Sequence, residues 1–525
     1  MTVEIVEEAG VKIPMRDGAL LNAMVWRPAG PGRYPVLLER VAYELVNRSR
    51  ANGQLYASQG YVVVAQNVRG TYASEGQFTL MFDDGWGERQ DGYDTVEWAA
   101  RQPWSDGNVG TIDGSYSGST QYLLAPTRPP HLRALLVRQS TGDLYHDWIA
   151  RGGAHSLDFM RRWTAGSILA PQLGGADGPL SEPGARPRVE GAIAEMERWL
   201  QHLPLMDWQP IGPAVGGLAD WYFDVLAHPD FGPYWHPVTM SLVAHEVDTP
   251  ILHVGSWFDV FLGGTLRAYT NIRARGRTAA CRDAQRLIVG PWIHSPANLG
   301  KREFGALDFG PEAPVDYDGL RLRWYDHWLK GVANGVMDGP RVRLFLMGTN
   351  RWIGLDEWPP PAAESRPLYL AGRAEAGVGR LSFEAPPPDD APDSFTYDPK
   401  DPVPSLVTNL QTWPVDHREI EDRVLVYTSE TLTEPLHVVG PVTAVLHASS
   451  SALDTDWVVR LCDVHPDGRS ITVCDGILRA RYRDSFEQPS LLEPGQVYRF
   501  EVDLRATAQT FLPGHRLRVH VTSSD

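Results

Sequence analysis

The sequence predicts an α/β core, a mostly parallel sheet flanked by helices, with an inserted helical block and a C-terminal β-sandwich. Three observations predict this fold. Apolar runs alternate with helical stretches up to about residue 140 and again from 250, strand patterns disappear in between, and period-two alternation follows about residue 355. The expected domains are a core in two parts, 1–144 and 241–354, a helical cap over 145–240 and a sandwich over 355–525.

The first part of the core alternates strands and helices. Val36-Leu37-Leu38 and Tyr61-Val62-Val63-Val64-Ala65 are short apolar runs of the kind that form buried strands, and Asp94–Ala100 has a helical pattern. Such alternation of β and α is typical of a sheet whose neighbouring strands are parallel. We therefore expect polar side chains at the carboxyl ends of these strands to gather along one edge of the sheet.

Ser115 follows one of these strands in a run of small residues, Val109-Gly110-Thr111-Ile112-Asp113-Gly114-Ser115-Tyr116-Ser117-Gly118. A strand that ends at a serine among small residues and continues into a helix is typical of a nucleophile elbow, although a plain glycine-serine turn is the alternative. The usual pattern is Gly-x-Ser-x-Gly, whereas Asp113 and Ser117 hold the two glycine positions here. Ser117 and Ser119 lie close enough to the turn to be alternative nucleophiles.

The helical cap is expected between the two parts of the core. Ile193, Met196, Trp199, Leu200 and Leu203 recur at helical spacing, and the segment shows no strand pattern. Inserted after the strand that carries Ser115, this block would cover the edge of the sheet where the serine lies. Its tryptophans, among them Trp148, Trp163 and Trp208, pack in the cap core or line a pocket; Trp148 and Trp163 are the predicted pocket residues.

The second part of the core supplies a carboxylate and an imidazole at two further strand ends. Asp259 ends the run Pro250-Ile251-Leu252-His253-Val254-Gly255-Ser256-Trp257-Phe258-Asp259, and His294 ends Arg286-Leu287-Ile288-Val289-Gly290-Pro291-Trp292-Ile293-His294. A strand-end aspartate can also cap a helix, and a single histidine can simply pack. The chain order Ser, Asp, His is nevertheless that of α/β hydrolases, in which the three form a catalytic triad. The sequence therefore predicts an α/β hydrolase with Ser115 as nucleophile, His294 as base and Asp259 as its orienting acid.

The third region follows the linker Trp358-Pro359-Pro360-Pro361. Tyr498, Phe500, Val502 and Leu504 alternate with charged residues, as do Leu517, Val519 and Val521, which is the pattern of half-buried strands. Several such strands separated by Gly, Pro and Asp predict a sandwich.

These motifs resemble the cocaine-esterase and X-prolyl dipeptidyl-peptidase family of serine hydrolases. The likeness rests on the segments around Ser115, Asp259 and His294, together with Gln66–Gly76 and Trp104–Gly110, and extends from near residue 10 to the last residue. It implies that the sandwich is a jelly roll and that family members continue beyond it, so that this chain resembles one cut short. It also implies that Tyr43 donates its hydroxyl to the oxyanion, beside the backbone N–H of Tyr116 that the elbow itself supplies.

The predicted function is hydrolysis of carboxylic esters through an acyl-enzyme. Family members that act on α-amino acid esters resemble one another in carrying acidic residues after the catalytic aspartate, where this chain has Val260-Phe261-Leu262. The apolar run favours an apolar or aromatic acyl group against Phe261, unless Asp143 or Asp158 binds an amine. The alternatives are an X-Pro dipeptidyl-peptidase or amidase on the same triad, and a non-catalytic carbohydrate-binding protein.

Composition narrows the range of partners. Acidic residues outnumber basic ones by 65 to 48, a net charge of −17, which argues against nucleic acid and anionic membranes. The start lacks the pattern of a signal peptide, no apolar stretch is long enough to span a bilayer, and the three cysteines are far apart, so a cytoplasmic location is expected. Since His-Glu-x-x-His, Cys-x-x-Cys and P-loop patterns are absent, the sequence predicts no metal and no cofactor. The expected partner is a small-molecule ester, and the sequence leaves a homo-oligomer open.

Overall fold

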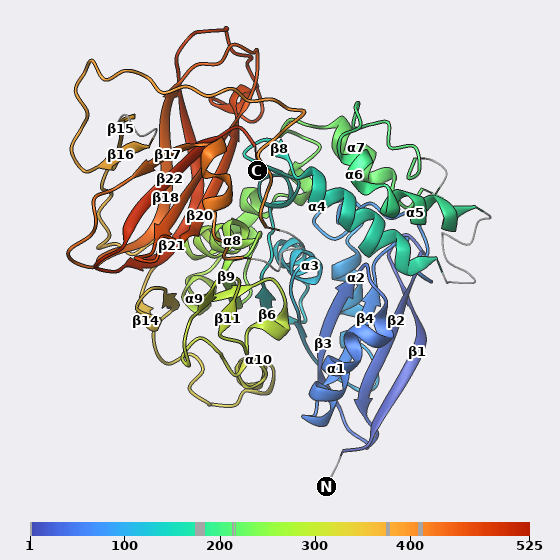
Figure 1. Ribbon diagram of the computed structural model, residues 1–525. Helices are drawn as coiled ribbons and strands as arrows, with labels where there is room; N and C mark the ends of the chain where they lie inside the picture. Colours follow the sequence, from blue (N-terminus) through green and yellow to red (C-terminus); the bar gives the residue numbers. More distant parts are fainter. Residues whose placement is uncertain are drawn as a thin grey trace.

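The computed structural model describes residues 3–173, 184–212, 215, 217–373, 378–407 and 413–524. Figure 1 shows the C-terminal strands (orange to red) at the upper left, the cap helices at the upper right and the first strands of the core below the cap. The three regions pack against one another, so the fold agrees with the predicted organisation of core, cap and sandwich. The domain boundaries given above stay predictions.

The core is a mostly parallel sheet. Within the described residues it has ten strands in the order β1-β2-β4-β3-β5-β6-β9-β10-β13-β14. Neighbours from β4 to β13 in this order are parallel, while β1, β2 and β14 pair antiparallel at the two edges. The strands are β1 (Ile5–Pro14), β2 (Leu20–Pro28), β3 (Tyr34–Val41), β4 (Val62–Asn67), β5 (Ser105–Thr111), β6 (Leu132–Arg138), β9 (Ile251–Phe258), β10 (Arg286–Ile293), β13 (Val342–Leu346) and β14 (Arg351–Leu355).

Helices cover both faces of this sheet, which explains why central strands such as β4 and β9 are buried along their whole length and do not alternate. Val63 and Ala65 of β4 belong to the apolar core that includes side chains of α1 and α10, and Val62 and Val64 belong to the one that includes side chains of α2 and α3. The core helices are α1 (Leu45–Ser58), α2 (Asp91–Ala100), α3 (Tyr116–Leu124), α8 (Leu262–Arg275), α9 (Ala279–Ala284) and α10 (Tyr317–Lys330). Two short strands, β11 (Glu303–Phe304) and β12 (Leu307–Asp308), form a separate hairpin.

The cap is helical, as predicted, with one exception. Its helices are α4 (Leu157–Arg162), the π-helical continuation Trp163–Leu169, α5 (Ala185–Ala194), α6 (Met196–Leu200) and α7 (Asp220–Ala227). The exception is a hairpin of β7 (Ala150–Arg151) and β8 (Ala154–His155), turned by Gly152 and Gly153, whose φ angles are +55° and +78°. Strands of two residues are too short to show a period, and a side chain on Gly152 would collide with the carbonyl of Ile477 in the sandwich.

The C-terminal region consists mainly of strands, as the period-two alternation predicted. In the described part of the chain one sheet has the order β15-β16-β17-β22-β19-β20, and β18 pairs with β21. Phe500, Val502 and Leu504 of β21 point into the apolar core of the sandwich, where they are at most 2% exposed. The strands are β15 (Tyr369–Arg373), β16 (Gly379–Ser382), β17 (Leu425–Thr428), β18 (Leu436–Ala448), β19 (Asp456–Val464), β20 (Ser470–Arg479), β21 (Tyr498–Phe511) and β22 (Arg516–Thr522).

Candidate active site

Ser115 lies in the turn between β5 and α3, as the elbow motif predicted. Its φ and ψ angles are +58° and −128°, a conformation that costs a non-glycine residue about 1–3 kcal/mol and that is characteristic of functional sites. The two glycines are required by close approach, since a Cβ on Gly114 would collide with the carbonyl of Arg138, and one on Gly118 would collide with Ser140. The backbone N–H of Ser115 donates to the carbonyl oxygens of Arg138 (3.0 Å) and Gln139 (3.2 Å).

The structure brings Ser115, His294 and Asp259 together in one hydrogen-bonded series. The Nε2 atom of His294 lies 3.0 Å from the Oγ of Ser115, and its Nδ1 lies 2.6 Å from Oδ2 of Asp259. The Asp259 side chain is fully buried, and its other oxygen accepts from the backbone N–H of Phe261 at 2.8 Å. In this geometry Asp259 orients the imidazole, whose far nitrogen faces the serine hydroxyl. The alternative serines Ser117 and Ser119 are completely buried.

Asp113 is neutralised by two arginines. Its φ angle is +79°, and its carboxylate contacts Arg138 at 2.8 Å and Arg48 at 3.5 Å. Burial alone would raise the pKa of Asp113, but Arg138 and Arg48 hold it below its usual value. A bare negative charge two residues before the nucleophile would disfavour an oxyanion, so this pairing explains how the departure from the usual glycine is tolerated.

Glu39 completes a cluster of charged side chains behind the elbow. It is fully buried at the end of β3, with Oε1 3.5 Å from Nε of Arg48 and 3.5 Å from the hydroxyl of Ser117. Burial, together with the nearby charge of Asp113, raises the pKa of Glu39 to about 7. The carboxyl pair therefore carries less than two full negative charges at neutral pH, facing the two guanidinium groups of Arg48 and Arg138.

The two predicted oxyanion donors lie near Ser115: Tyr116 directly follows it, and Tyr43 lines the same cavity. Tyr116 is the first residue of α3, where a backbone N–H has no acceptor within the helix. The hydroxyl oxygen of Tyr43 accepts a hydrogen bond from Nε1 of Trp163 at 2.9 Å, which leaves the hydroxyl hydrogen available to a second acceptor. Arg48 stacks over the Tyr43 ring at 4.7 Å, so the charged cluster also fixes the position of this ring. The oxyanion roles of Tyr43 and Tyr116 stay predictions.

A cavity of about 780 Å³ opens at Ser115 and His294. Trp148, Trp163 and Phe261, the predicted pocket residues, all lie in its wall, and Trp148 contacts the other two rings edge-on with centroids 5.2 Å away. Trp208 instead packs in the cap core, 1% exposed, with Arg161 above its ring. The other lining residues are Tyr43, Arg48, Arg138, Asp158, Phe159, Arg162, Gly166, Ser167, Pro171, Ser295, Pro296 and Val407.

The charges in the cavity wall are mainly positive. Arg48, Arg138 and Arg162 line it against a single carboxylate among the described residues, Asp158, which pairs with Arg162 at 2.5 Å. Asp143, the other carboxylate considered from the sequence, is buried behind the wall and accepts from the backbone N–H of Ser241. His294 and Asp158 are not a metal-ligand set, and the cavity offers no site for a metal cofactor within the described chain.

Sequence reasoning missed two residues that hold the site together. Gln139, directly after β6 and with φ +47°, donates to the hydroxyl of Ser256 and to the carbonyl of Ile293, and accepts from the backbone N–H of Ser295. It thus ties the strand beside Ser115 to the strands that carry Asp259 and His294. The one signal in the sequence that could have pointed to Gln139 is its position directly after a strand.

The second missed residue is Arg505, which reaches the site from the sandwich. Its guanidinium donates to the carbonyl oxygen of Asp259 at 3.0 Å and pairs with Asp475 at 2.6 Å. Asp475 pairs in turn with Arg151 of the cap, also at 2.6 Å. The segment that carries Asp259 is therefore held by contacts from outside the core, which no local pattern around residue 505 could indicate.

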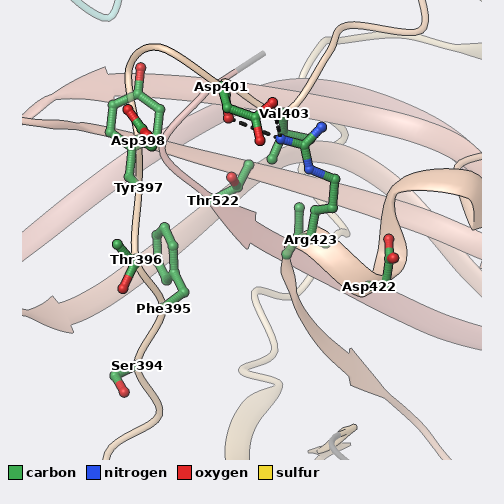
Figure 2. A pocket seen from close by; sticks show the side chains of 11 residues that line it. Ser394, Phe395, Thr396, Tyr397, Asp398, Asp401, Val403, Asp422, Arg423 and Thr522 are labelled. Carbon is green, nitrogen blue, oxygen red and sulfur yellow. Dashed lines mark hydrogen bonds and ion pairs between the residues drawn. The ribbon is translucent and has the colours of Figure 1, made fainter.

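A second cavity, of about 370 Å³, lies in the sandwich beside the loop 394–403 (Figure 2). Its one arginine, Arg423, pairs with Asp401 at 2.9 Å, and Phe395 packs edge-on against Trp457 of the sandwich core. The cavity has no nucleophile beside a base among its lining residues. The chemistry of the described chain is therefore expected at Ser115.

Comparison with known proteins finds relatives over most of the chain. The X-Pro dipeptidyl-peptidase (S15 family) model matches residues 17–296, and the X-Pro dipeptidyl-peptidase C-terminal non-catalytic domain matches residues 334–525. The chain is 36% identical to the cocaine esterase of Rhodococcus sp. (strain MB1 Bresler), over 98% of this chain and 90% of that protein.

Two solved structures share the whole architecture. An α-amino acid ester hydrolase is 27% identical, with a TM-score of 0.79 over 99% of this chain and 89% of that one. An aminopeptidase from a marine sediment Thaumarchaeota archaeon is also 27% identical, with a TM-score of 0.78 over 100% and 89%. The predicted α/β-hydrolase fold with its C-terminal β domain is thereby confirmed. The chain belongs to the S15 family of serine hydrolases, which includes X-Pro dipeptidyl-peptidases and cocaine esterase.

Proposed function

We propose that the chain is a serine esterase in which Ser115, His294 and Asp259 cleave a carboxylic ester through an acyl-enzyme. The observation that carries the proposal is the hydrogen-bonded series of these three side chains at the mouth of an aromatic cavity. The relatives include a cocaine esterase and a putative serine esterase of Mycobacterium bovis, which supports ester hydrolysis.

The mechanism follows from the roles of the three groups. Ser115 Oγ attacks the carbonyl carbon as its proton passes to Nε2 of His294, and the oxyanion accepts from Tyr43 and from the N–H of Tyr116. The ester C–O bond then breaks, and the imidazolium of His294 protonates the departing alcohol. Water, deprotonated by the same imidazole, then attacks the acyl carbon, the bond to Ser115 Oγ breaks, and the imidazolium returns its proton to Oγ as the acid leaves. Asp259 stays ionised throughout and stabilises the imidazolium.

Covalent labelling tests the nucleophile. A fluorophosphonate should modify the chain once, on the peptide that contains Ser115, and Ser115→Ala should abolish both labelling and hydrolysis of p-nitrophenyl esters. Ser167→Ala is the matched control, because Ser167 lines the same cavity from the cap side. Labelling that persists in Ser115→Ala, or that maps to Ser117, would overturn the assignment.

We further propose that the acyl group is apolar or aromatic. Trp148, Trp163 and Phe261 offer ring faces and edges beside Ser115, and aromatic contacts of this kind add about 0.5–1.5 kcal/mol each beyond area burial. A free α-ammonium finds little to pair with, since Asp158 is already paired with Arg162. This disfavours amino-ester and X-Pro dipeptide substrates, which present a positively charged amine.

A parallel substrate panel tests this specificity. Phenyl benzoate, phenyl acetate, the p-nitrophenyl ester of phenylalanine and glycyl-proline p-nitroanilide differ in acyl group, charge and scissile bond. We expect the largest kcat/KM for the aromatic, uncharged acyl group and the smallest for the dipeptide anilide. A preference for either amine-bearing substrate would refute the acyl-group proposal and leave the esterase mechanism intact.

Location and assembly are separate proposals. None of the helices in the described ranges has the length and apolarity that crossing a bilayer requires. We propose a cytoplasmic enzyme, which cell fractionation tests, and light scattering would establish whether it is a homo-oligomer.

A further inference from the structure

A cluster of metal-ligating side chains lies in the sandwich, outside the active site. Asp463 stands near the end of β19, His465 follows in the turn to β20, and His515 comes from the turn before β22. One ligand atom from each of the three lies within 4.8 Å of the other two, and the residues are buried or half-buried. Asp463 and His465 are two residues apart, whereas His515 comes from another turn 50 residues later, so no local spacing motif could have indicated the full set.

We propose that Asp463, His465 and His515 bind one divalent transition-metal ion of the Zn²⁺ type. Two imidazoles and one carboxylate are a common protein donor set for such ions, with a fourth position left for water. The ion would join the β19–β20 turn to the β21–β22 turn, and so act on the stability of the sandwich rather than on ester chemistry.

The distances suit such an ion. Oδ1 of Asp463 lies 2.8 Å from Nδ1 of His515, and Oδ2 lies 3.9 Å from Nε2 of His465. Ligand atoms about 2.1 Å from a tetrahedral ion are about 3.4 Å apart, between these two values. Binding one ion therefore requires the three side chains to adjust, with the hydrogen bond between Asp463 and His515 exchanged for bonds to the ion.

The charges of the cluster also favour a cation. Asp463 is buried, and its hydrogen-bond partners are His515 and the amide of Gln509, which donates to Oδ2 at 3.1 Å. The imidazole rings of His465 and His515 are 4.6 Å apart, so both can face one ion beside the carboxylate.

The three side chains of the cluster are partly exposed, so a metal ion could reach them from solvent. The side chain of His465 is 18% exposed, while those of His515 and Asp463 are 11% and 6% exposed. Gln509 lies on the stretch of β21 where the backbone bonds to Met347 of the core. A bound ion would therefore stiffen the sandwich where it joins the core.

Cobalt titration of the full chain tests the proposal. After treatment with EDTA and its removal, Co²⁺ should bind at one equivalent, with the visible absorption of a four-coordinate site, and Zn²⁺ should displace it and raise the Tm. His465→Asn and His515→Asn should each weaken binding by at least about 100-fold, since even outer-shell changes cost 10- to 100-fold. Affinity should fall as the pH is lowered, because the imidazoles must be neutral to bind.

His437→Asn is the matched control, because this histidine lies on β18 of the same domain and bonds to Thr510 outside the cluster. It should bind cobalt like the wild type. Retained esterase activity shows that each variant is folded, so a loss of binding can be attributed to the ligands. The proposal would be overturned if the wild type gave no stoichiometric cobalt spectrum. It would also be overturned if His465→Asn and His515→Asn bound cobalt as tightly as the wild type.

Discussion

Replacing Asp113 tests how the charged cluster behind the elbow supports the site. Asp113→Asn removes the carboxylate that pairs with Arg138 at 2.8 Å, and the side chain of Arg138 is 2% exposed. Breaking a buried pair by removing one partner costs about 3–5 kcal/mol, since the other charge is left buried. Here Glu39, which pairs with Arg48, offsets part of the lost charge of the cluster, because its pKa falls when the neighbouring charge of Asp113 disappears. We therefore expect Asp113→Asn to lower the free energy of unfolding by about 2 kcal/mol.

Asp113→Gly separates the charge from the backbone. The native φ of +79° strains a side-chain-bearing residue, and glycine relieves about 1 kcal/mol of that strain. Asp113→Gly should thus lower the free energy of unfolding by about 1 kcal/mol less than Asp113→Asn does. In both variants kcat should fall about 10-fold or less, because Arg48, which lies over the Tyr43 ring, keeps Glu39 as a partner.

Urea denaturation measures the free energies and p-nitrophenyl ester hydrolysis measures kcat. Asp94→Asn is the control, because Asp94 pairs with Arg16 at a similar 2.9 Å near the surface and should cost less than about 1 kcal/mol. An Asp113→Asn variant as stable as the wild type would refute the importance of the pair. A higher kcat in Asp113→Gly would mean that the aspartate slows catalysis despite its arginine partners.

Three further changes probe the oxyanion donor, the sandwich contact and the titrating cluster. Tyr43→Phe should lower kcat about 100-fold or more with a small change in KM, as expected for one lost oxyanion donor, and unchanged turnover would remove Tyr43 from the mechanism. Arg505→Met should lower kcat about 10-fold by loosening the Asp259 segment, whereas Arg499→Gln, an exposed site on the same strand, should leave it unaltered. Equal kinetics for the two variants would show that the contact is not needed. Glu39→Gln should become more stable relative to the wild type as the pH rises. In the folded wild type the Glu39 carboxyl stays protonated up to about pH 7, whereas in the unfolded chain it ionises from about pH 4.5. Between these pH values Glu39 therefore lowers the free energy of unfolding increasingly, by at most about 3 kcal/mol. Unfolding of both proteins is measured at pH 4.5 and at pH 8. The same difference in free energy of unfolding between wild type and variant at both pH values would contradict this linkage.

The sequence predicted the parts of the site that depend on local structure. Ser115, Asp259 and His294 each follow a predicted strand, and the carboxyl ends of parallel strands meet at one sheet edge, so their proximity could be expected. The partners of Asp113 could not be predicted in this way. Arg138 stands 25 residues later and Arg48 65 residues earlier, and the pattern around 113 carries no sign of either. Their meeting depends on which strands are neighbours and on how α1 packs.

Contacts between domains were the least predictable, and they bear directly on the site. Arg505 belongs to β21, whose alternation predicted a half-buried strand and nothing more, yet its guanidinium bonds to the backbone of Asp259. The series continues through Asp475 to Arg151 of the cap, so one buried carboxylate links the sandwich both to the cap and to the segment that orients His294. Arg151 and Arg505 hold the pKa of Asp475 well below its usual value despite its burial, so the carboxylate is charged at neutral pH. We therefore expect the C-terminal domain to act on catalysis without contributing a reacting group, because Arg505 holds the backbone of the aspartate that is proposed to orient the imidazole.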